Sequence, residues 1–512
     1  MLNKKSIGIV ALINGFSTVL GLVYSVVLAR YFGTSANIEV YFAATTLLFM
    51  INSLTQSGQL AEIALPVYHK FQAEEGQDSA NQVMSVIFNW MGLIAIGFTL
   101  FSFLGAPWLY YASASGFSPD QLKEGIFLFR IISPLLFVEI MKSQITSMVN
   151  AEKRFGKIEW INIINQLTSM AFIVLLSGSW DIYSVVAGLW VGELLAIGYG
   201  VYVLSKTKFR YSLRLKKEGF AVGSVLKNMT YTFAYVIVTQ GYLFYMNNLL
   251  THLPKGQYAI YKYANLIFTK IQGLLIRPVS TIFFSQFSSA YHAGSEKLKH
   301  LVEETTSLSF VLSTLVFAGM MAAGHPMLSL LWEGDKFDAD SVRLVYLTLT
   351  MVSFGLFMNS LALVYRKIVM TLGKVKEQYL AYMLVQVLSS GLLWLLRDHI
   401  SIWSLVDVYL VNTLLLSAVP VVLAKLHSGT PIPVNLGSSS LRNLLFFVFL
   451  VVAAWSIEWS DSSFDFWPKG RMLDLFLSGL AFGLAALFFA FVFQLNEIRL
   501  IKALRSRIAS KL

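Results

Sequence analysis

Long apolar runs follow one another along the whole chain, and short polar or basic segments separate them. A helix needs about 20 mostly apolar residues to cross the hydrocarbon core of a bilayer, and about fourteen runs reach that length. The pattern predicts membrane spans at 6–30, 38–65, 82–111, 125–150, 158–178 and 182–205 in the first half. In the second half it predicts 222–250, 257–287, 303–332, 342–370, 377–396, 400–425, 440–458 and 472–495.

The loops between these spans alternate in charge. Every second loop is basic, and the loops between them are short or acidic. Because basic loops stay in the cytoplasm, the alternation supports an even number of spans and places both termini on the cytoplasmic side. The basic segments contain Lys4 and Lys5, Lys153, Arg154 and Lys157, the run from Lys206 to Lys217, Lys374 and Lys376, and the tail from Arg499 to Lys511.

Composition agrees with a membrane protein and excludes several other classes. The chain is 56% hydrophobic and only 13% charged. Its net charge of +11 comes from short clusters between apolar runs rather than from one basic face, which argues against nucleic-acid binding. The absence of Cys excludes disulfides, thiolate zinc sites and a cysteine nucleophile.

The two halves of the chain are related at a shift of about 220 residues. Tyr41–Ala43 matches Tyr261–Ala264, and Phe155–Lys157 matches Leu372–Lys374. The predicted fold is therefore an all-α polytopic membrane protein with two pseudo-symmetric six-helix lobes and two extra C-terminal helices. The predicted parts are an N-terminal lobe at 1–205, a basic cytoplasmic linker at 206–220, a C-terminal lobe at 221–427, two further helices within 438–497 and a basic cytoplasmic tail at 498–512.

Motifs of enzymatic chemistry are missing from the sequence. It has no P-loop, no His-Glu-x-x-His and no Gly-rich dinucleotide fingerprint, and its loops are too short for a polymerase or ligase site. We expect a transporter without catalytic residues, bound metal or cofactor. Ionisable residues inside the spans are costly in hydrocarbon, so they are the candidate functional groups.

Three cations in the predicted eighth span are candidates for binding phosphate. Lys262, Lys270 and Arg277 lie within about 100° of one another around a helix, so all three can face one cavity. Cations in a cleft of low dielectric bind a diphosphate strongly. The alternative for Lys262 is snorkelling to the interface, because it lies near the outer end of its span.

Acidic residues in or near the spans are candidates for ion coupling. Glu62 and Glu193 have no obvious partner nearby in sequence, and Asp407 lies near the outer end of its span, where solvation is an equal alternative. Glu139 and Lys142 are one turn apart and are predicted to form a structural pair. Coupling to Na⁺, to protons or to the membrane potential is expected.

Polar residues of the first two spans complete the candidate substrate-binding set. Asn52, Gln56 and Gln59 recur at helical spacing, which indicates a polar face toward a water-filled cavity. Arg30 ends the first span and is either a ligand or an interfacial anchor.

Several short motifs resemble the MurJ (MviN) branch of the multidrug, oligosaccharidyl-lipid and polysaccharide exporter superfamily. The resemblance rests on Val27–Gly33, Glu39–Ala43, Leu65–Tyr68, Ala106–Trp108, Gly116–Phe117 and Asn150–Phe155. It implies two lobes around a cavity, alternating access, a lipid-tail groove from the last two helices, and a bacterial inner-membrane location. The implied substrate is an undecaprenyl-diphosphate-linked sugar moved to the outer leaflet.

Departures from the family pattern decide between substrates. Thr18, Tyr24 and Asn52 stand where relatives that flip lipid II carry cavity arginines. The sequence therefore favours a flippase for a repeat unit of an exopolysaccharide or another cell-surface glycan, with lipid II as the alternative. A cation-coupled multidrug exporter and a non-transporting scaffold of glycan assembly stay open as well. The expected partners are the lipid-linked sugar, the bilayer and a glycan polymerase or another assembly protein.

Overall fold

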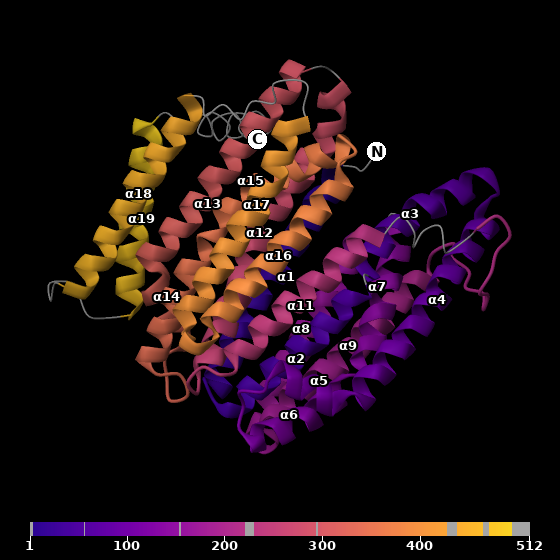
Figure 1. The fold of residues 1–512 in the computed structure, drawn as a ribbon, viewed down its shortest axis with the longest axis horizontal. Helices are drawn as coiled ribbons and strands as arrows, with labels where there is room; N and C mark the ends of the chain where they lie inside the picture. Colours follow the sequence, from indigo (N-terminus) through magenta and orange to yellow (C-terminus); the bar gives the residue numbers. More distant parts are fainter. Residues whose placement is uncertain are drawn as a thin grey trace. The chain divides into compact units, whose positions relative to one another are not determined.

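The computed structural model describes residues 4–55, 57–152, 155–220, 230–292, 295–427, 438–463 and 471–493. Within these ranges the secondary structure is helical apart from two isolated bridges, one in the basic linker and one before α14 (Ala339–Ser353). The chain divides into two compact units, drawn in Figure 1. The first contains Met1–Lys262 with Gln386–Leu405, and the second contains Tyr263–Val385 with Val406–Leu512.

The first unit is a bundle in which helices pack both against neighbours in sequence and against helices far apart in the chain. In it α8 packs against α1 and α9, α7 packs against α4 and α9, α2 packs against α6, and α3 packs against α4. Its helices are α1 (Lys4–Phe32), α2 (Ala36–Leu54), α3 (Ser57–Glu74), α4 (Gln77–Leu104), α5 (Ala106–Ser113), α6 (Pro119–Ile132), α7 (Leu135–Ala151), α8 (Phe155–Trp180), α9 (Ile182–Ser205) and α11 (Thr230–Leu250).

The second unit is organised around one long helix, α13, which packs against α14, α15, α18 and α19. Phe317 of α13, Phe357 of α15 and Phe447 of α18 pack their rings together, with centroids 5.0 to 6.2 Å apart. The remaining helices are α12 (Gln257–His292), which begins in the first unit, α13 (Ser295–Trp332), α15 (Gly355–Thr371), α16 (Val375–Leu396), α17 (Ile402–His427), α18 (Ser438–Ser463) and α19 (Arg471–Val492). The second half of α16 and the start of α17, within Gln386–Leu405, belong to the first unit.

Two predicted spans are broken at corresponding places. The span predicted at 125–150 consists of α6 and α7, which meet at Ser133 and Pro134. The span predicted at 342–370 consists of α14 and α15, which meet at Phe354. Because these breaks are separated by the same shift of about 220 residues, they extend the internal repeat that the sequence predicts.

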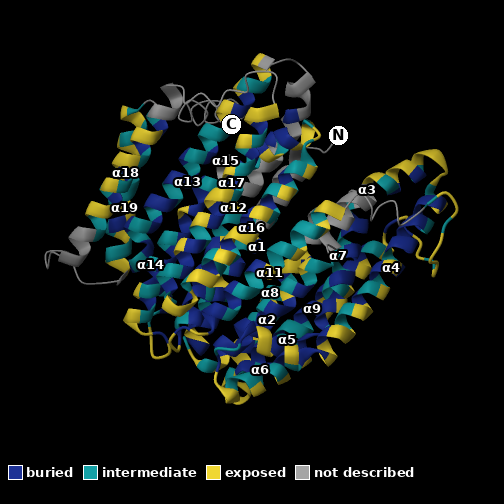
Figure 2. Cartoon of the chain, viewed as in Figure 1, coloured by how far each residue is buried: buried dark blue, intermediate teal, exposed yellow. Residues whose placement is uncertain are grey.

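The burial pattern fits a lipid-facing surface. Large apolar side chains are exposed, for example Leu175, Leu487 and Phe491, each more than 70% exposed. Exposed residues, in yellow, recur along the helices in Figure 2. Such a surface is stable only against hydrocarbon. Ten helices or helix pairs in the described ranges are long and apolar enough to cross a membrane. The remaining predicted spans coincide with α6 and α7 together, α11, α12 and α18.

These features confirm the predicted fold class, an all-α polytopic membrane protein. The total of about fourteen spans stays a prediction. The predicted lobe boundaries at 205 and 221 stay a prediction as well. The compact units place α11 and the first turns of α12 with the N-terminal helices.

Candidate functional site

The face of α9 that contacts α8 is built from small residues. Gly188, Gly192, Ala196 and Gly200 recur at every fourth position and are all buried. A Cβ atom added to Gly188 would lie 2.9 Å from Cα of Ser169, and one added to Gly192 would lie 3.0 Å from the carbonyl oxygen of Asn165. Small residues at this spacing let two helix backbones approach closely. A polar side chain of α8, that of Asn165, can therefore contact the side chain of Glu193 on α9 directly.

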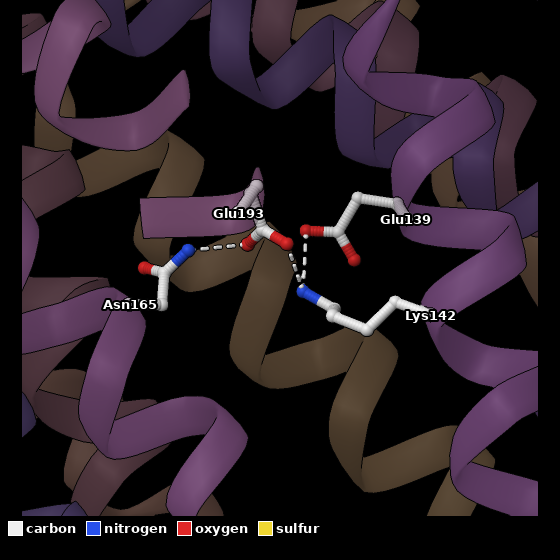
Figure 3. A network of polar contacts seen from close by, with 4 residues as sticks. All are labelled: Glu139, Lys142, Asn165 and Glu193. Atoms are coloured by element: carbon white, nitrogen blue, oxygen red, sulfur yellow. Dashed lines mark hydrogen bonds and ion pairs between the residues drawn. The ribbon is translucent and has the colours of Figure 1, made fainter. Parts of the chain in front are cut away.

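Glu193 follows this small-residue face and lies at the centre of a buried polar cluster (Figure 3). Its Oε2 atom lies 2.5 Å from Nζ of Lys142 on α7. Its Oε1 atom accepts a hydrogen bond of 2.5 Å from Nδ2 of Asn165 on α8. Lys142 also donates to Oε1 of Glu139, one turn earlier on α7, at 3.0 Å. We call these four residues the charge cluster.

The charge cluster carries more negative than positive charge. Two carboxylates share one ammonium, so the cluster has a net charge of −1 when all three groups are ionised. The side chains of Glu193, Lys142 and Glu139 are only 5%, 16% and 19% exposed. A buried charge without a counter-charge is costly in a membrane protein, so the excess negative charge makes the cluster a candidate site for one additional cation.

A second polar arrangement joins α2 to the start of α12. The buried carboxylate of Glu39 accepts backbone hydrogen bonds from Gly256 at 3.0 Å and from Ala259 at 3.3 Å. These N–H groups belong to the first turn of α12, where an anion is favoured by the helix dipole. Glu39 therefore fixes the N-terminus of α12 against α2.

Lys262 lies one turn further along α12 and is held within the same unit. Its Nζ donates to Oδ1 of Asn247 on α11 at 2.9 Å and stacks over the ring of Tyr258 at 5.1 Å. The Tyr258 hydroxyl donates to the same Asn247 oxygen at 2.8 Å. Asn247 in turn donates to the carbonyl oxygen of Ser113 at 3.1 Å. Lys262 and Asn247 therefore connect α12, α11 and the end of α5 near Glu39.

A pocket of about 830 Å³ opens beside these residues in the first unit. Its lining includes the carboxylates of Glu39, Asp120 and Glu124 and one ammonium, that of Lys255. Because carboxylates outnumber cations there, the pocket is poorly suited to an anionic diphosphate.

Comparison with known proteins decides the family. The sequence model of the family described as "Lipid II flippase MurJ" matches residues 28–423. The chain belongs to the MurJ family. The match covers most of both compact units, which agrees with the resemblance of the N-terminal motifs.

Curated relatives of this MurJ family member are similar over most of their length. A probable lipid II flippase MurJ of Thermotoga maritima is 22% identical over 380 residues, 74% of this chain and 76% of the relative. A lipid II flippase MurJ of Burkholderia cenocepacia is 22% identical over 357 residues, 67% of this chain and 69% of the relative.

Solved structures agree on the fold. One described as "Lipid II flippase MurJ, inward closed conformation" aligns with a TM-score of 0.76 at 19% identity, and covers 96% of this chain and 99% of the other. An inward-facing multidrug-resistance transporter of the MATE family and MOP superfamily aligns with a TM-score of 0.63 at 11% identity, over 86% of this chain and 98% of the other.

The structure places the sequence-predicted coupling residues separately. Glu193 is buried in the charge cluster, whereas Asp407 is exposed on α17 in the second unit. The predicted pair of Glu139 and Lys142 is present, and it is joined by Glu193. The side chain of Glu62 lies outside the described residues.

The predicted substrate-binding residues of this MurJ family member are also dispersed. Lys262 is bound to Asn247 as described above, and Lys270 is half-buried further along α12. Arg30 is exposed at the end of α1. Asn52 is half-buried, and its Oδ1 atom is buried without a hydrogen bond from the described residues. Gln56 and the side chain of Arg277 lie outside the described residues.

Sequence reasoning missed four contributors to these sites. Asn165 is followed by Gln166 and Asn247 by Asn248, and nothing in the sequence shows which of these amides meets a charged group. The small-residue face of α9 was readable from the spacing of Gly188 and Gly192, which is that of a helix-packing motif. The sequence indicated Glu39 only as part of the family motif Glu39–Ala43 and did not predict its contact with the start of α12.

Proposed function

We propose that this chain is a lipid II flippase, which carries the lipid-linked peptidoglycan precursor from the inner to the outer leaflet of the cytoplasmic membrane by alternating access. The family match over residues 28–423 carries the proposal. Curated relatives described as lipid II flippases support it, and so does the likeness of fold over 96% of the chain. An exopolysaccharide repeat unit, which the sequence favoured, has no such support.

The charge cluster supplies a coupling site in this proposal. Its excess negative charge binds one proton or one Na⁺, and the bound cation removes the cost of the unpaired carboxylate. Lys142 pairs with both carboxylates, so binding of a cation at one of them releases the ammonium toward the other. The cation thus changes contacts between α7 and α9, which is a differential interaction of the kind that shifts a conformational equilibrium.

The cations of α12 remain the proposed diphosphate ligands. Lys270 and Arg277 are the principal pair, with Arg30, Asn52 and Gln56 as further polar contacts. Lys262 contributes to the proposed substrate site indirectly, by positioning α11 through its hydrogen bond to Asn247, because its ammonium already donates to that side chain. The chain performs no covalent step in this proposal, and glycan polymerases are its proposed partners.

A leaflet-accessibility assay tests the substrate. Purified protein is reconstituted into liposomes that contain either lipid II or an undecaprenyl-diphosphate oligosaccharide, and the fraction of each lipid in the outer leaflet is measured over time. We expect protein-dependent movement of lipid II. Movement of the oligosaccharide alone would return the function to the repeat-unit flippase, and movement of neither would favour a drug exporter or a scaffold.

A substitution tests the coupling site. Glu193→Gln removes the excess charge and leaves Lys142 paired with Glu139, so the bundle stays intact. We expect the flipping rate to lose its dependence on a proton or Na⁺ gradient. Glu124→Gln is the matched control, because Glu124 is a half-buried carboxylate of the same unit that accepts a hydrogen bond from Tyr183 away from the cluster. Equal gradient dependence in both variants would contradict the assignment.

A further inference from the structure

The basic linker, residues 206–220, lies against α4 in an extended conformation (Figure 1). Polar residues on one face of α4 form hydrogen bonds with the backbone of the linker. Asn81 donates to the carbonyl oxygen of Lys208 at 3.3 Å, and Asn89 donates to that of Arg214 at 2.8 Å. Ser85, between these two residues, accepts a hydrogen bond of 3.1 Å from the backbone N–H of Ser212.

Further contacts fix both ends of the linker. At its start Phe209 is buried in the same apolar cluster as Phe71 and Met84. Near its end Trp90 donates to the carbonyl oxygen of Leu215 at 3.0 Å, and Lys217 pairs with Glu75 at 3.0 Å. Residues 81, 85 and 89 are successively one helical turn apart, so they lie on a single face of α4. This face provides hydrogen bonds to backbone N–H and C=O groups of the linker, which are costly to leave unpaired beside a membrane.

Glu75 strengthens the last of these contacts. The Ser79 hydroxyl and the Lys217 ammonium hold the pKa of the Glu75 carboxyl below its usual value. The carboxylate therefore stays ionised and keeps its partners at neutral pH.

Tyr211 of the linker faces α4, where its hydroxyl donates to Oδ1 of Asn89 at 2.7 Å. The exposed side chains of the linker are of two kinds. Leu213 and Leu215 are apolar and 84% and 47% exposed. Apart from Lys206, which stacks over the ring of Tyr202, the linker has four exposed cations, Lys208, Arg210, Arg214 and Lys216. A leucine so exposed is unfavourable in water, but a segment that mixes basic and apolar side chains binds well at the boundary between lipid headgroups and acyl chains.

We infer that the basic linker is a docking surface for anionic phospholipids of the cytoplasmic leaflet. The four exposed cations contact lipid phosphates, and Leu213 inserts between the headgroups. Three observations support this occupant. The linker follows directly on α9, a candidate membrane span; it is fixed to α4, another such span; and its charge is opposite to that of anionic lipids. Each cation near an anionic membrane surface raises surface affinity about fivefold.

A spin label tests the inference in the full-length protein. The chain has no Cys, so Leu213→Cys can be labelled at a single site with a nitroxide. The protein is placed in nanodiscs of phosphatidylcholine alone or mixed with phosphatidylglycerol. Collisions of the label with oxygen, which prefers lipid, are compared with collisions with a water-soluble nickel chelate.

We expect the label to enter the lipid phase in the anionic nanodiscs and to return to water at high salt. Neutralising the linker should abolish the shift, since four cations together account for an affinity change on the order of 500-fold. The test variant carries Lys208→Gln, Arg210→Gln, Arg214→Gln and Lys216→Gln. The matched control carries Lys123→Gln, Lys336→Gln, Arg343→Gln and Arg397→Gln, which remove the same charge at exposed positions outside the linker.

Three outcomes would overturn the inference. The label could remain in water in both membranes, or the control could lose the shift as completely as the linker variant. The label could also enter lipid only after an undecaprenyl-diphosphate lipid is added, which would make the linker a substrate contact instead. Thermal unfolding of each variant in detergent separates these outcomes from misfolding.

Discussion

Lys142→Met is the substitution that tests the charge cluster most directly. Methionine keeps an unbranched side chain of similar length but removes the ammonium. Glu139 and Glu193 then lose the cation that lies 3.0 and 2.5 Å from their oxygens, and the described residues offer no other cation in its place. Asn165 still donates to Glu193, but an amide carries no charge.

The size of the effect follows from burial. Removing one partner of a buried ion pair costs about 3 to 5 kcal/mol, because the remaining charge is left without compensation. Glu193 is 5% exposed and should bear most of that cost, whereas Glu139 at 19% keeps some solvation. A triple variant that neutralises the whole cluster, with Glu139→Gln, Lys142→Met and Glu193→Gln together, should cost far less, since buried ion pairs are often exchanged for neutral groups of similar shape at little loss.

Reversible unfolding in mixed micelles, followed by tryptophan fluorescence, measures these free energies. We expect Lys142→Met to be the least stable variant, the triple variant to recover most of the loss, and Glu193→Gln alone to remain within about 1 kcal/mol of the parent, because Lys142 retains Glu139. If Lys142→Met unfolds like the parent, the carboxylates are solvated and the excess-charge argument fails. If the triple variant is as unstable as the single one, the loss comes from packing.

Three further predictions concern other parts of the chain. Gly192→Leu should push α8 from α9 and destabilise the bundle by about 1 to 3 kcal/mol in the same unfolding assay, whereas Gly198→Leu, which meets no atom within 4 Å, should be tolerated; equal losses would contradict the close approach. Acidification should release the end of the basic linker. The pKa of the Glu75 carboxyl is lower in the folded protein than in the unfolded chain, so its pairing with Lys217 is complete above the unfolded pKa. The pairing is lost as the pH falls through the lower folded pKa and the carboxyl is protonated. Faster proteolysis of the linker at acidic pH, absent in Lys217→Met, would be the signature, and an unchanged transition in that variant would refute it. Lys270→Ala should abolish flipping of lipid II while leaving expression intact, and full transport would remove Lys270 from the substrate site.

Much of the fold was predictable because hydrophobic length is a local property. The observed helices overlap the predicted spans, although the span predicted at 38–65 runs from α2 into α3 and the span predicted at 82–111 runs from α4 into α5. The pair of Glu139 and Lys142 followed from their spacing of one turn. The break between α6 and α7 was signalled only by Pro134, which can also end or kink a helix without dividing a span.

The partners of the buried polar groups were not predictable in the same way. Glu193 meets Lys142 and Asn165 from two other helices, and the pairing depends on helix packing that no local pattern encodes. The basic linker was readable as a charged loop, but its attachment to α4 depends on Asn81 and Asn89, which alone indicate only a polar helix face.

The polar arrangements of the first unit differ in how their charges are held. Around the start of α12, the carboxylate of Glu39 accepts backbone hydrogen bonds and the ammonium of Lys262 donates to a side-chain amide. These hydrogen bonds to neutral groups hold the helices together. The charge cluster is different, because Glu139 and Glu193 exceed Lys142 by one charge. In the proposed coupling role, a bound cation removes this excess charge, and a proton or Na⁺ gradient would act on α7, α8 and α9 through the cluster.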